Sequence, residues 1–332
     1  MNHAARAKLY QQIETQRDTK LIGLETQIAE DCVDLFVDLL DTIGPVRSIS
    51  LLLHTNGGQT SAAWRLINLI RMFCDELEVI VPLKALSAGT LISLGADRII
   101  MTKQAALGPI DPSLLHALSP TVPFGNPAAR VAVSVEAVRG YLDAATRDLS
   151  IKDDASLAGI LTDLSCKIHP LVLGEIFRSR EQIRFLANKL IRKQVQDEEK
   201  VKTIIDFLCA DSGSHDYTIN RREADTLGLK VEKPSAELYP VLKQIHQSYV
   251  DEMKLLEPFS REVLLGTAQR APYCLVRSLV ERAEGKRYEF VSEGVMTRTT
   301  IMPIPVPGSP TPAVPQEAIS DQRTFEGWRS KI

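Results

Sequence analysis

Apolar residues recur every three to four positions between residues 28 and 43, which is the spacing of one face of an α-helix. Aspartates occupy the other faces of this stretch, and Gly44-Pro45 ends it. The next apolar run, residues 49–53, is continuous and leads into a glycine turn, as is typical of a strand buried on both faces. The pattern therefore predicts an amphipathic helix followed by a buried strand.

Two more short strands are predicted over residues 78–82 and 97–102. Helical stretches over residues 60–75 and 87–96 separate the three strands and are long enough to be crossovers. The order β-α-β-α-β with short turns implies an α/β fold with parallel strands and right-handed connections. A functional site in such a fold is expected at the carboxyl ends of the strands.

The rest of the chain reads as mostly helical. A Pro-rich loop over residues 119–127 is followed by a helical pattern to about residue 210, and residues 237–284 are predicted as further helix. Residues 287–301 contain two β-rich halves and predict a hairpin. Residues 302–315 predict a linker or tail, because proline removes the amide donors that a helix or sheet requires.

These elements divide the chain into four segments. Residues 3–20 are polar with no strong apolar stripe, so the N-terminal segment is predicted to be an exposed helical arm. The predicted organisation is an arm over 1–25, a main α/β domain over 26–235, a helical and hairpin extension over 236–301, and a Pro-rich tail over 302–332.

Composition narrows the classes of function. The 39 Lys and Arg residues nearly balance the 42 Asp and Glu residues, so the net charge of −3 gives no reason to expect nucleic acid as a partner. The five cysteines are dispersed with no C-x-x-C pair, and no Walker-type phosphate loop is present, so no metal or other cofactor is expected. No apolar run approaches the roughly 20 residues of a membrane span, and the first residues lack a secretion signal. We therefore expect a soluble, cytoplasmic protein.

Two motifs that follow predicted strands carry the candidate chemistry. In Asn56-Gly57-Gly58, paired glycines allow backbone amides to face outward, where they can hold an oxyanion. In the run from Ala85 to Thr90, Ser87 begins a helix, so the amide of Ala88 can be a second oxyanion donor. Each motif also has a structural explanation, since serine is a common helix cap and glycine pairs form turns. Their joint occurrence after parallel strands favours a nucleophilic serine with an oxyanion hole made by Gly57, Gly58 and Ala88.

The runs LLLHTNGGQTSAAWRLINLI and KALSAGTLISLGADRIIMTKQAALGPIDPSL resemble the serine dehydrogenase proteinase family. This family is related to signal peptide peptidase A and to the proteolytic subunit of Clp protease. The resemblance is strong over residues 48–115 and weaker over 166–231. It implies a ClpP/crotonase-like spiral of β-α-β units with an added helical region, with Ser87 as the nucleophile and homo-oligomers as the usual assembly. Asp216 falls at the position of the aspartate of the Clp protease triad.

The general base is not fixed by the resemblance. Clp proteases carry a histidine in the turn that here spans Leu107–Pro112, and this turn contains none. A serine hydroxyl needs a base at neutral pH, and His215 is the first choice, with Asp111 or Asp216 to orient it. The Gly-Pro-x-Asp-Pro sequence around Asp111 is also a strong turn signal. The other bases considered are His169, His54 and a lysine from Lys84, Lys103 or Lys167.

The sequence thus predicts a serine peptidase that hydrolyses peptide or protein substrates through an acyl-enzyme on Ser87. Two alternatives stay open at this point. One is a crotonase-type acyl-CoA enzyme, in which the same amides would stabilise an enolate. The other is a non-catalytic scaffold of the same fold.

Overall fold

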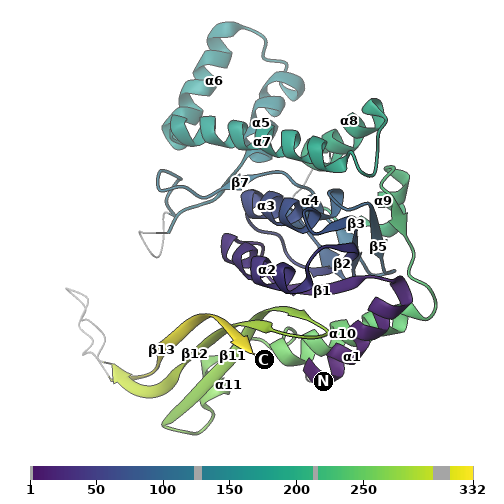
Figure 1. Cartoon of the computed structure of the whole chain (residues 1–332). Coiled ribbons are helices and arrows are strands. Elements are labelled where there is room, and N and C mark those ends of the chain that lie inside the picture. Colours follow the sequence, from purple (N-terminus) through teal and green to yellow (C-terminus); the bar gives the residue numbers. More distant parts are fainter. Residues whose placement is uncertain (1–2, 123–128, 212–215, 302–314, 332) are drawn as a thin grey trace. The chain divides into compact units, whose positions relative to one another are not determined.

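The computed structural model describes residues 3–122, 129–211, 216–301 and 315–331 (Figure 1). The chain forms two compact units, Ile28–Pro234 and the combination of Met1–Gln27 with Ser235–Ile332. The boundaries predicted at residues 26 and 235 lie close to this division. The segments predicted as a separate N-terminal arm and C-terminal extension belong to one unit.

A parallel sheet forms the core of the Ile28–Pro234 unit, with strand order β10-β5-β3-β2. The predicted β-α-β-α-β order is confirmed. Seven residues from Ser48 to His54 are buried in sequence, which explains the continuous apolar run. The strands are β2 (Val46–His54), β3 (Cys74–Val81), β5 (Arg98–Met101) and β10 (Val231–Glu232). Helix α2 (Glu30–Ile43) precedes β2, α3 (Thr60–Arg71) joins β2 to β3, and α4 (Ala88–Leu94) lies between β3 and β5.

Helix α2 accounts for the apolar periodicity over residues 28–43. The buried residues of this helix lie on one face, and the helix stops at Gly44, whose φ of 67° lies in the left-handed region that favours glycine. Burial of this face against the sheet supplies most of the stability of such a helix. The buried side chains are those of Cys32, Val33, Phe36, Leu39 and Leu40.

A second, three-stranded sheet brings three separate chain segments together. Strand β4 (Lys84–Ala85) pairs in parallel with β6 (Ala106–Leu107), and β6 pairs antiparallel with β9 (Ile219–Asn220). These strands are only two residues long, so their role is to fix the loops that they join rather than to build a core. The helix α9 (Arg221–Thr226) follows β9 directly.

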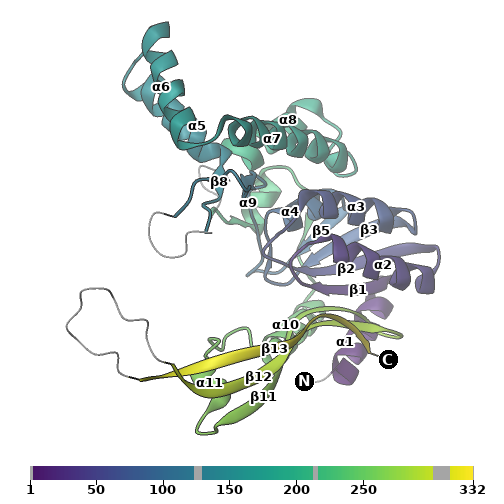
Figure 2. The ribbon, with the colours of Figure 1, turned by 90° about the vertical axis from the view of Figure 1, so that its left-hand side faces the viewer.

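Figure 2 shows the helical region of this unit. This region has its own small apolar core. Its apolar residues come mainly from α5 and the first half of α7, namely Val133, Val135, Val138, Val172, Leu173 and Ile176. At the far end of α7, Gln194 donates hydrogen bonds to the carbonyls of Ser93 and Leu94 at the end of α4. The elements are β7 (Ser113–Leu114), β8 (Val133–Ser134), α5 (Val135–Asp143), α6 (Asp154–Lys167), α7 (Pro170–Ile191) and α8 (Glu198–Asp206), with π-helical turns at Ala144–Asp148 and Phe207–Asp211.

Among the described residues, no individual helix has both the length and the apolar character needed to cross a bilayer. Helices α6 and α7, which meet at a bend of 101°, satisfy the criterion only when taken together and only by length and composition.

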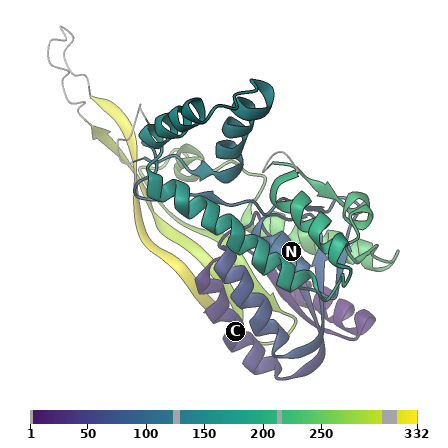
Figure 3. The same ribbon diagram turned by 90° about the horizontal axis from the view of Figure 1, so that it is seen from above.

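The second unit is built on an antiparallel sheet in the order β1-β11-β12-β13, whose last three strands run side by side (Figure 3). The N-terminal helix α1 is not the exposed arm that was predicted, because Arg6, Tyr10 and Ile13 are buried. The elements are α1 (His3–Arg17), β1 (Lys20–Glu25), α10 (Leu238–Met253), α11 (Arg261–Leu265), β11 (Arg270–Arg282), β12 (Arg287–Ile301) and β13 (Gln316–Lys331).

Three predictions for this unit are wrong. Residues 237–284 are helical only in α10 and α11 and then form β11, and residues 287–301 are one strand rather than a hairpin. The predicted tail over 302–332 contains β13 at residues 316–331, whereas most of the Pro-rich run lies outside the described residues. Strand β13 is polar and its register is set by pairing with β12, so no local apolar pattern marks it.

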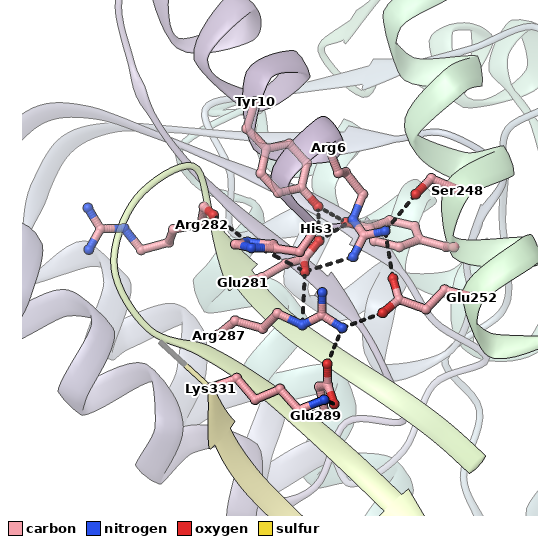
Figure 4. A network of polar contacts seen from close by, with 11 residues as sticks. His3, Arg6, Tyr10, Ser248, Glu252, Glu281, Arg282, Arg287, Glu289 and Lys331 are labelled. Atoms are coloured by element: carbon pink, nitrogen blue, oxygen red, sulfur yellow. Dashed lines mark hydrogen bonds and ion pairs between the residues drawn. The ribbon is translucent and has the colours of Figure 1, made fainter. Parts of the chain in front are cut away.

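A buried polar network ties α1 and α10 to this sheet (Figure 4). The guanidinium of Arg6 is fully buried and donates to both carboxylate oxygens of Glu281 on β11 and, at 2.6 Å, to Ser248 on α10. The hydroxyls of Tyr10 and Tyr249 hydrogen-bond each other, and Tyr10 also donates to Glu281 at 2.6 Å. Burial raises the pKa of both tyrosines well above the usual value, so both remain protonated donors.

We predict that Arg6→Met destabilises the protein by about 3 to 5 kcal/mol, because it removes the cation that compensates a fully buried carboxylate. Chemical denaturation of the full chain measures this free energy of unfolding. The matched control is Arg65→Met, which breaks an exposed ion pair with Glu30 and should change stability far less. Equal losses in the two variants would contradict the prediction.

Candidate active site

Ser87 lies in the sharp turn between β4 and α4, with φ 51° and ψ −111°. A positive φ is unusual for a residue with a side chain, and such strained residues concentrate at functional sites. The side chain is partly exposed and makes no capping hydrogen bond to α4. The simpler explanation of Ser87 as a helix cap therefore does not hold.

Backbone pairing brings the two predicted motifs together. The end of β2 pairs with β4, because the Thr55 amide donates to the Lys84 carbonyl at 3.0 Å and the Leu86 amide donates to the Thr55 carbonyl at 3.1 Å. The glycine loop that follows lies directly against the serine. A Cβ placed on Gly57 would be 2.8 Å from the Ser87 Cβ and 3.3 Å from its Oγ. No residue larger than glycine fits at this position.

The three predicted oxyanion donors are not equivalent. The Gly57 amide already donates to the Thr55 Oγ1 at 3.0 Å, so the assignment of Gly57 as a donor needs correction. The structure shows no hydrogen-bond partner for the amides of Gly58 and Ala88 within its described ranges. Gly58 and Ala88 therefore remain the predicted pair of donors.

Gly58 is fixed by a close approach to the start of α2. The Ile28 amide donates to the Gly57 carbonyl at 2.8 Å, and the Gln59 amide donates to the Ile28 carbonyl at 2.7 Å. With a φ of 146°, Gly58 would place an added Cβ only 2.0 Å from the Ile28 carbonyl oxygen. Glycine is required here by backbone packing as well as by backbone conformation.

The turn that carries Asp111 lies beside the serine loop. The Thr90 hydroxyl of α4 accepts a hydrogen bond from the Gly108 amide at 3.0 Å, and a Cβ on Gly108 would lie 3.2 Å from the Leu86 side chain. Asp111 itself is 5% exposed. Burial raises the pKa of the Cys209 thiol to about 12, and the nearby Asp111 carboxylate adds to this rise.

The candidate bases differ in where they lie in the structure. His215, the first choice, lies outside the described residues, and the neighbouring Asp216 is exposed. The strand β9, which starts at Ile219, pairs with Leu107, so the chain after Asp216 reaches the same sheet as the Asp111 turn. Strand β4, which ends two residues before Ser87, and strand β9, which begins three residues after Asp216, both pair with β6.

His169 is not brought to Ser87. It is an exposed N-cap whose Nδ1 accepts a hydrogen bond from the Leu171 amide at 3.2 Å. Helix α7 has 22 residues and spans about 33 Å, and its opposite end packs with Leu190 against Gly95, just after α4. The remaining candidates are His54, which is buried, Lys84, which is half-buried in β4, and Lys103 and Lys167, which are exposed.

Two threonines that the sequence analysis did not single out hold the site together. Thr55 binds the glycine loop, and Thr90 binds the Asp111 turn. A signal for Thr55 was present, because threonine hydroxyls commonly hydrogen-bond the backbone two residues ahead, which here is Gly57.

Comparison with known proteins finds a family model that matches the segment containing the site. Residues 39–123 match the sequence model of the ClpP-like SDH-type serine proteinases. This match confirms the resemblance inferred from the motifs. The matched range includes Ser87, both glycines of the loop and the Asp111 turn.

Two similar proteins come from Methanocaldococcus jannaschii. Uncharacterized protein MJ0137 is 31% identical over 211 residues, which cover 64% of this chain and 63% of that protein. Uncharacterized protein MJ1495 is 28% identical over 240 residues, which cover 68% of this chain and 71% of that protein. The chain therefore matches less than two thirds of the length of MJ0137.

Solved structures show weaker similarity. A mutant of the 1510-N membrane-bound stomatin-specific protease has a TM-score of 0.41 at 15% identity and covers 65% of this chain and 79% of that chain. A mutant of ClpP1 from Listeria monocytogenes has a TM-score of 0.38 at 14% identity and covers 68% of this chain and 99% of that chain.

We predict that Gly58→Ala lowers the free energy of unfolding by more than about 2 kcal/mol, because the new methyl group collides with the Ile28 carbonyl. Thermal and chemical denaturation measure the loss. Gly140→Ala is the matched control, since a Cβ there has no atom within 4 Å and alanine favours the helix. A Gly58→Ala protein as stable as the wild type would contradict this packing.

Proposed function

We propose that this protein is a serine peptidase that cleaves peptide bonds through an acyl-enzyme on Ser87. The observation that carries the proposal is the position of the Ser87 hydroxyl. It makes no capping hydrogen bond to helix α4 and lies beside the Gly57-Gly58 loop. The family match over residues 39–123 supports the same function.

In the proposed reaction, the Ser87 Oγ attacks the carbonyl carbon of a peptide bond while a general base takes the hydroxyl proton. The carbonyl oxygen becomes an oxyanion, and the amides of Gly58 and Ala88 donate hydrogen bonds to it. Collapse of this intermediate breaks the C–N bond, and the leaving amine takes a proton from the protonated base. Water then hydrolyses the ester and restores Ser87.

His215 is the proposed base, with Asp111 or Asp216 as the carboxylate that orients it. The pairing of β6 with β9 supports this assignment, because it holds the chain near Asp216 and the Asp111 turn in one sheet with the serine strand. A lysine base, most simply the half-buried Lys84, is the alternative.

The peptidase is favoured over an acyl-CoA enzyme by the conformation of Ser87. A crotonase-type reaction needs the two amides but no nucleophile. It therefore gives no role to a serine that has a strained, positive φ and a hydroxyl without a capping hydrogen bond. We further propose that the protein acts on peptides or proteins, as a cytoplasmic homo-oligomer. The resemblance supports the peptide or protein substrate and the homo-oligomer.

Ser87→Ala is expected to abolish labelling by a fluorophosphonate probe, which reacts with an activated serine and displaces fluoride. The readout is the label per protein chain measured after gel separation. Ser165→Ala on α6 is the control and should label as the wild type does. Equal labelling of the wild type and Ser87→Ala would contradict the proposal.

A second prediction concerns the base. If His215 accepts the proton, the labelling rate falls in acid, because only the neutral imidazole can act as a base. His215→Gln should lower the rate about 100- to 10,000-fold at neutral pH and remove this pH dependence. His169→Gln should leave both unchanged. A His215→Gln protein with the wild-type rate and pH profile would exclude His215, and loss of labelling in Lys84→Met would then identify the lysine.

A further inference from the structure

Thr55 contacts both halves of the proposed site with four different groups. Its backbone amide and carbonyl bind Lys84 and Leu86, the residues just before Ser87. Its hydroxyl binds Gly57, and its methyl group lies against Gly89, where an added Cβ would be 2.5 Å from the Thr55 Cγ2. The side chain is 3% exposed, so water does not compete for these contacts.

The Thr55 hydroxyl hydrogen-bonds both the amide and the carbonyl of Gly57. It accepts from the Gly57 amide at 3.0 Å and donates to the Gly57 carbonyl at 3.2 Å. The same carbonyl accepts from the Ile28 amide at 2.8 Å. Thr55 and Ile28 therefore fix the direction of this carbonyl together.

The direction of the Gly57 carbonyl also sets the direction of the Gly58 amide. Both groups belong to one peptide unit, which is planar and trans, so they point in opposite directions. Glycine on each side of this unit makes rotation of the whole plane inexpensive, because glycine tolerates both signs of φ. A plane rotated by half a turn would aim the carbonyl, rather than the amide, at the oxyanion.

We propose that Thr55 is a positioning residue that holds the Gly57–Gly58 peptide plane so that the Gly58 amide faces the carbonyl attacked by Ser87. This inference rests on the proposed peptidase function. Thr55 does not touch the substrate; it acts through the peptide unit that does. The backbone pairing of Thr55 with Lys84 and Leu86 keeps this plane in register with the serine.

The test compares three variants of the full chain by the kinetics of fluorophosphonate labelling. Thr55→Val keeps the shape but removes the hydroxyl, and Thr55→Ser keeps the hydroxyl but removes the methyl group. Thr102→Val is the matched control, because Thr102 is also buried and its hydroxyl donates to the Pro82 carbonyl at 2.7 Å, away from the glycine loop. Circular dichroism and thermal denaturation report folding of each variant.

Thr55→Val is expected to lower the maximal labelling rate about 10- to 100-fold, somewhat less than the complete loss of an oxyanion donor. The probe concentration that gives half the maximal rate should stay unchanged, because the plane matters only when negative charge develops on the bound oxygen. Thr55→Ser should restore the maximal rate, and Thr102→Val should lose stability without losing rate. A purely structural role of Thr55 would not lower the maximal labelling rate while leaving the half-maximal probe concentration unchanged.

The outcomes separate this inference from the function on which it rests. Wild-type protein that does not label would overturn the peptidase proposal and this inference with it. Wild-type protein that labels, together with Thr55→Val that labels at the same maximal rate, would overturn the inference alone. A Thr55→Ser variant as slow as Thr55→Val would also overturn it. If Thr55→Val does not fold, Thr55→Ala replaces it, with the same loss of rate expected.

Discussion

The pairing of the end of β2 with β4 is the contact on which the site depends. Thr55 exchanges two backbone hydrogen bonds with Lys84 and Leu86, and this places the glycine loop within van der Waals distance of Ser87. The proposed reaction needs both motifs, because a serine without oxyanion donors and donors without a nucleophile each lack half of the chemistry. Backbone pairing joins them with a precision that flexible side chains could not supply.

Other elements of the Ile28–Pro234 unit hold this contact in place. The buried parallel strands β2 and β3 fix where each loop begins, and the short sheet of β4, β6 and β9 fixes where the loops go next. Thr90 connects α4 to the turn of Asp111 through a buried hydroxyl. Gly57, Gly58 and Gly89 then allow approaches that any side chain would block. The strain at Ser87 persists because the surrounding hydrogen bonds over-determine its backbone.

The other unit is held by a different kind of interaction. Its buried arginine, glutamates and tyrosines form a connected polar network, in which each charge is compensated by a partner from another element. Such networks contribute little net stability relative to an apolar core, but they penalise any arrangement that leaves a charge unpaired. The network therefore specifies how α1, α10 and the sheet fit together, while Gly23 on β1 leaves space for the hydroxyls of Tyr10 and Tyr249.

Features that depend on a local pattern of residues could be predicted from the amino-acid sequence. Periodicity predicted α2 and the β-α-β-α-β core, and the residue types of Gly57-Gly58 and Ser87 predicted a nucleophile beside backbone donors, since these signals are contained in a few adjacent residues. Tertiary structure decided what depends on partners far along the chain. Strands β11 to β13 form because they pair with one another, and Arg6 is buried because Glu281, on β11, compensates its charge. The assignment of Gly58 rather than Gly57 as the free donor required the position of the Thr55 hydroxyl, which no spacing of residue types reveals. Long-range pairing and hydrogen-bond geometry are properties of the folded chain, so only the fold could supply them.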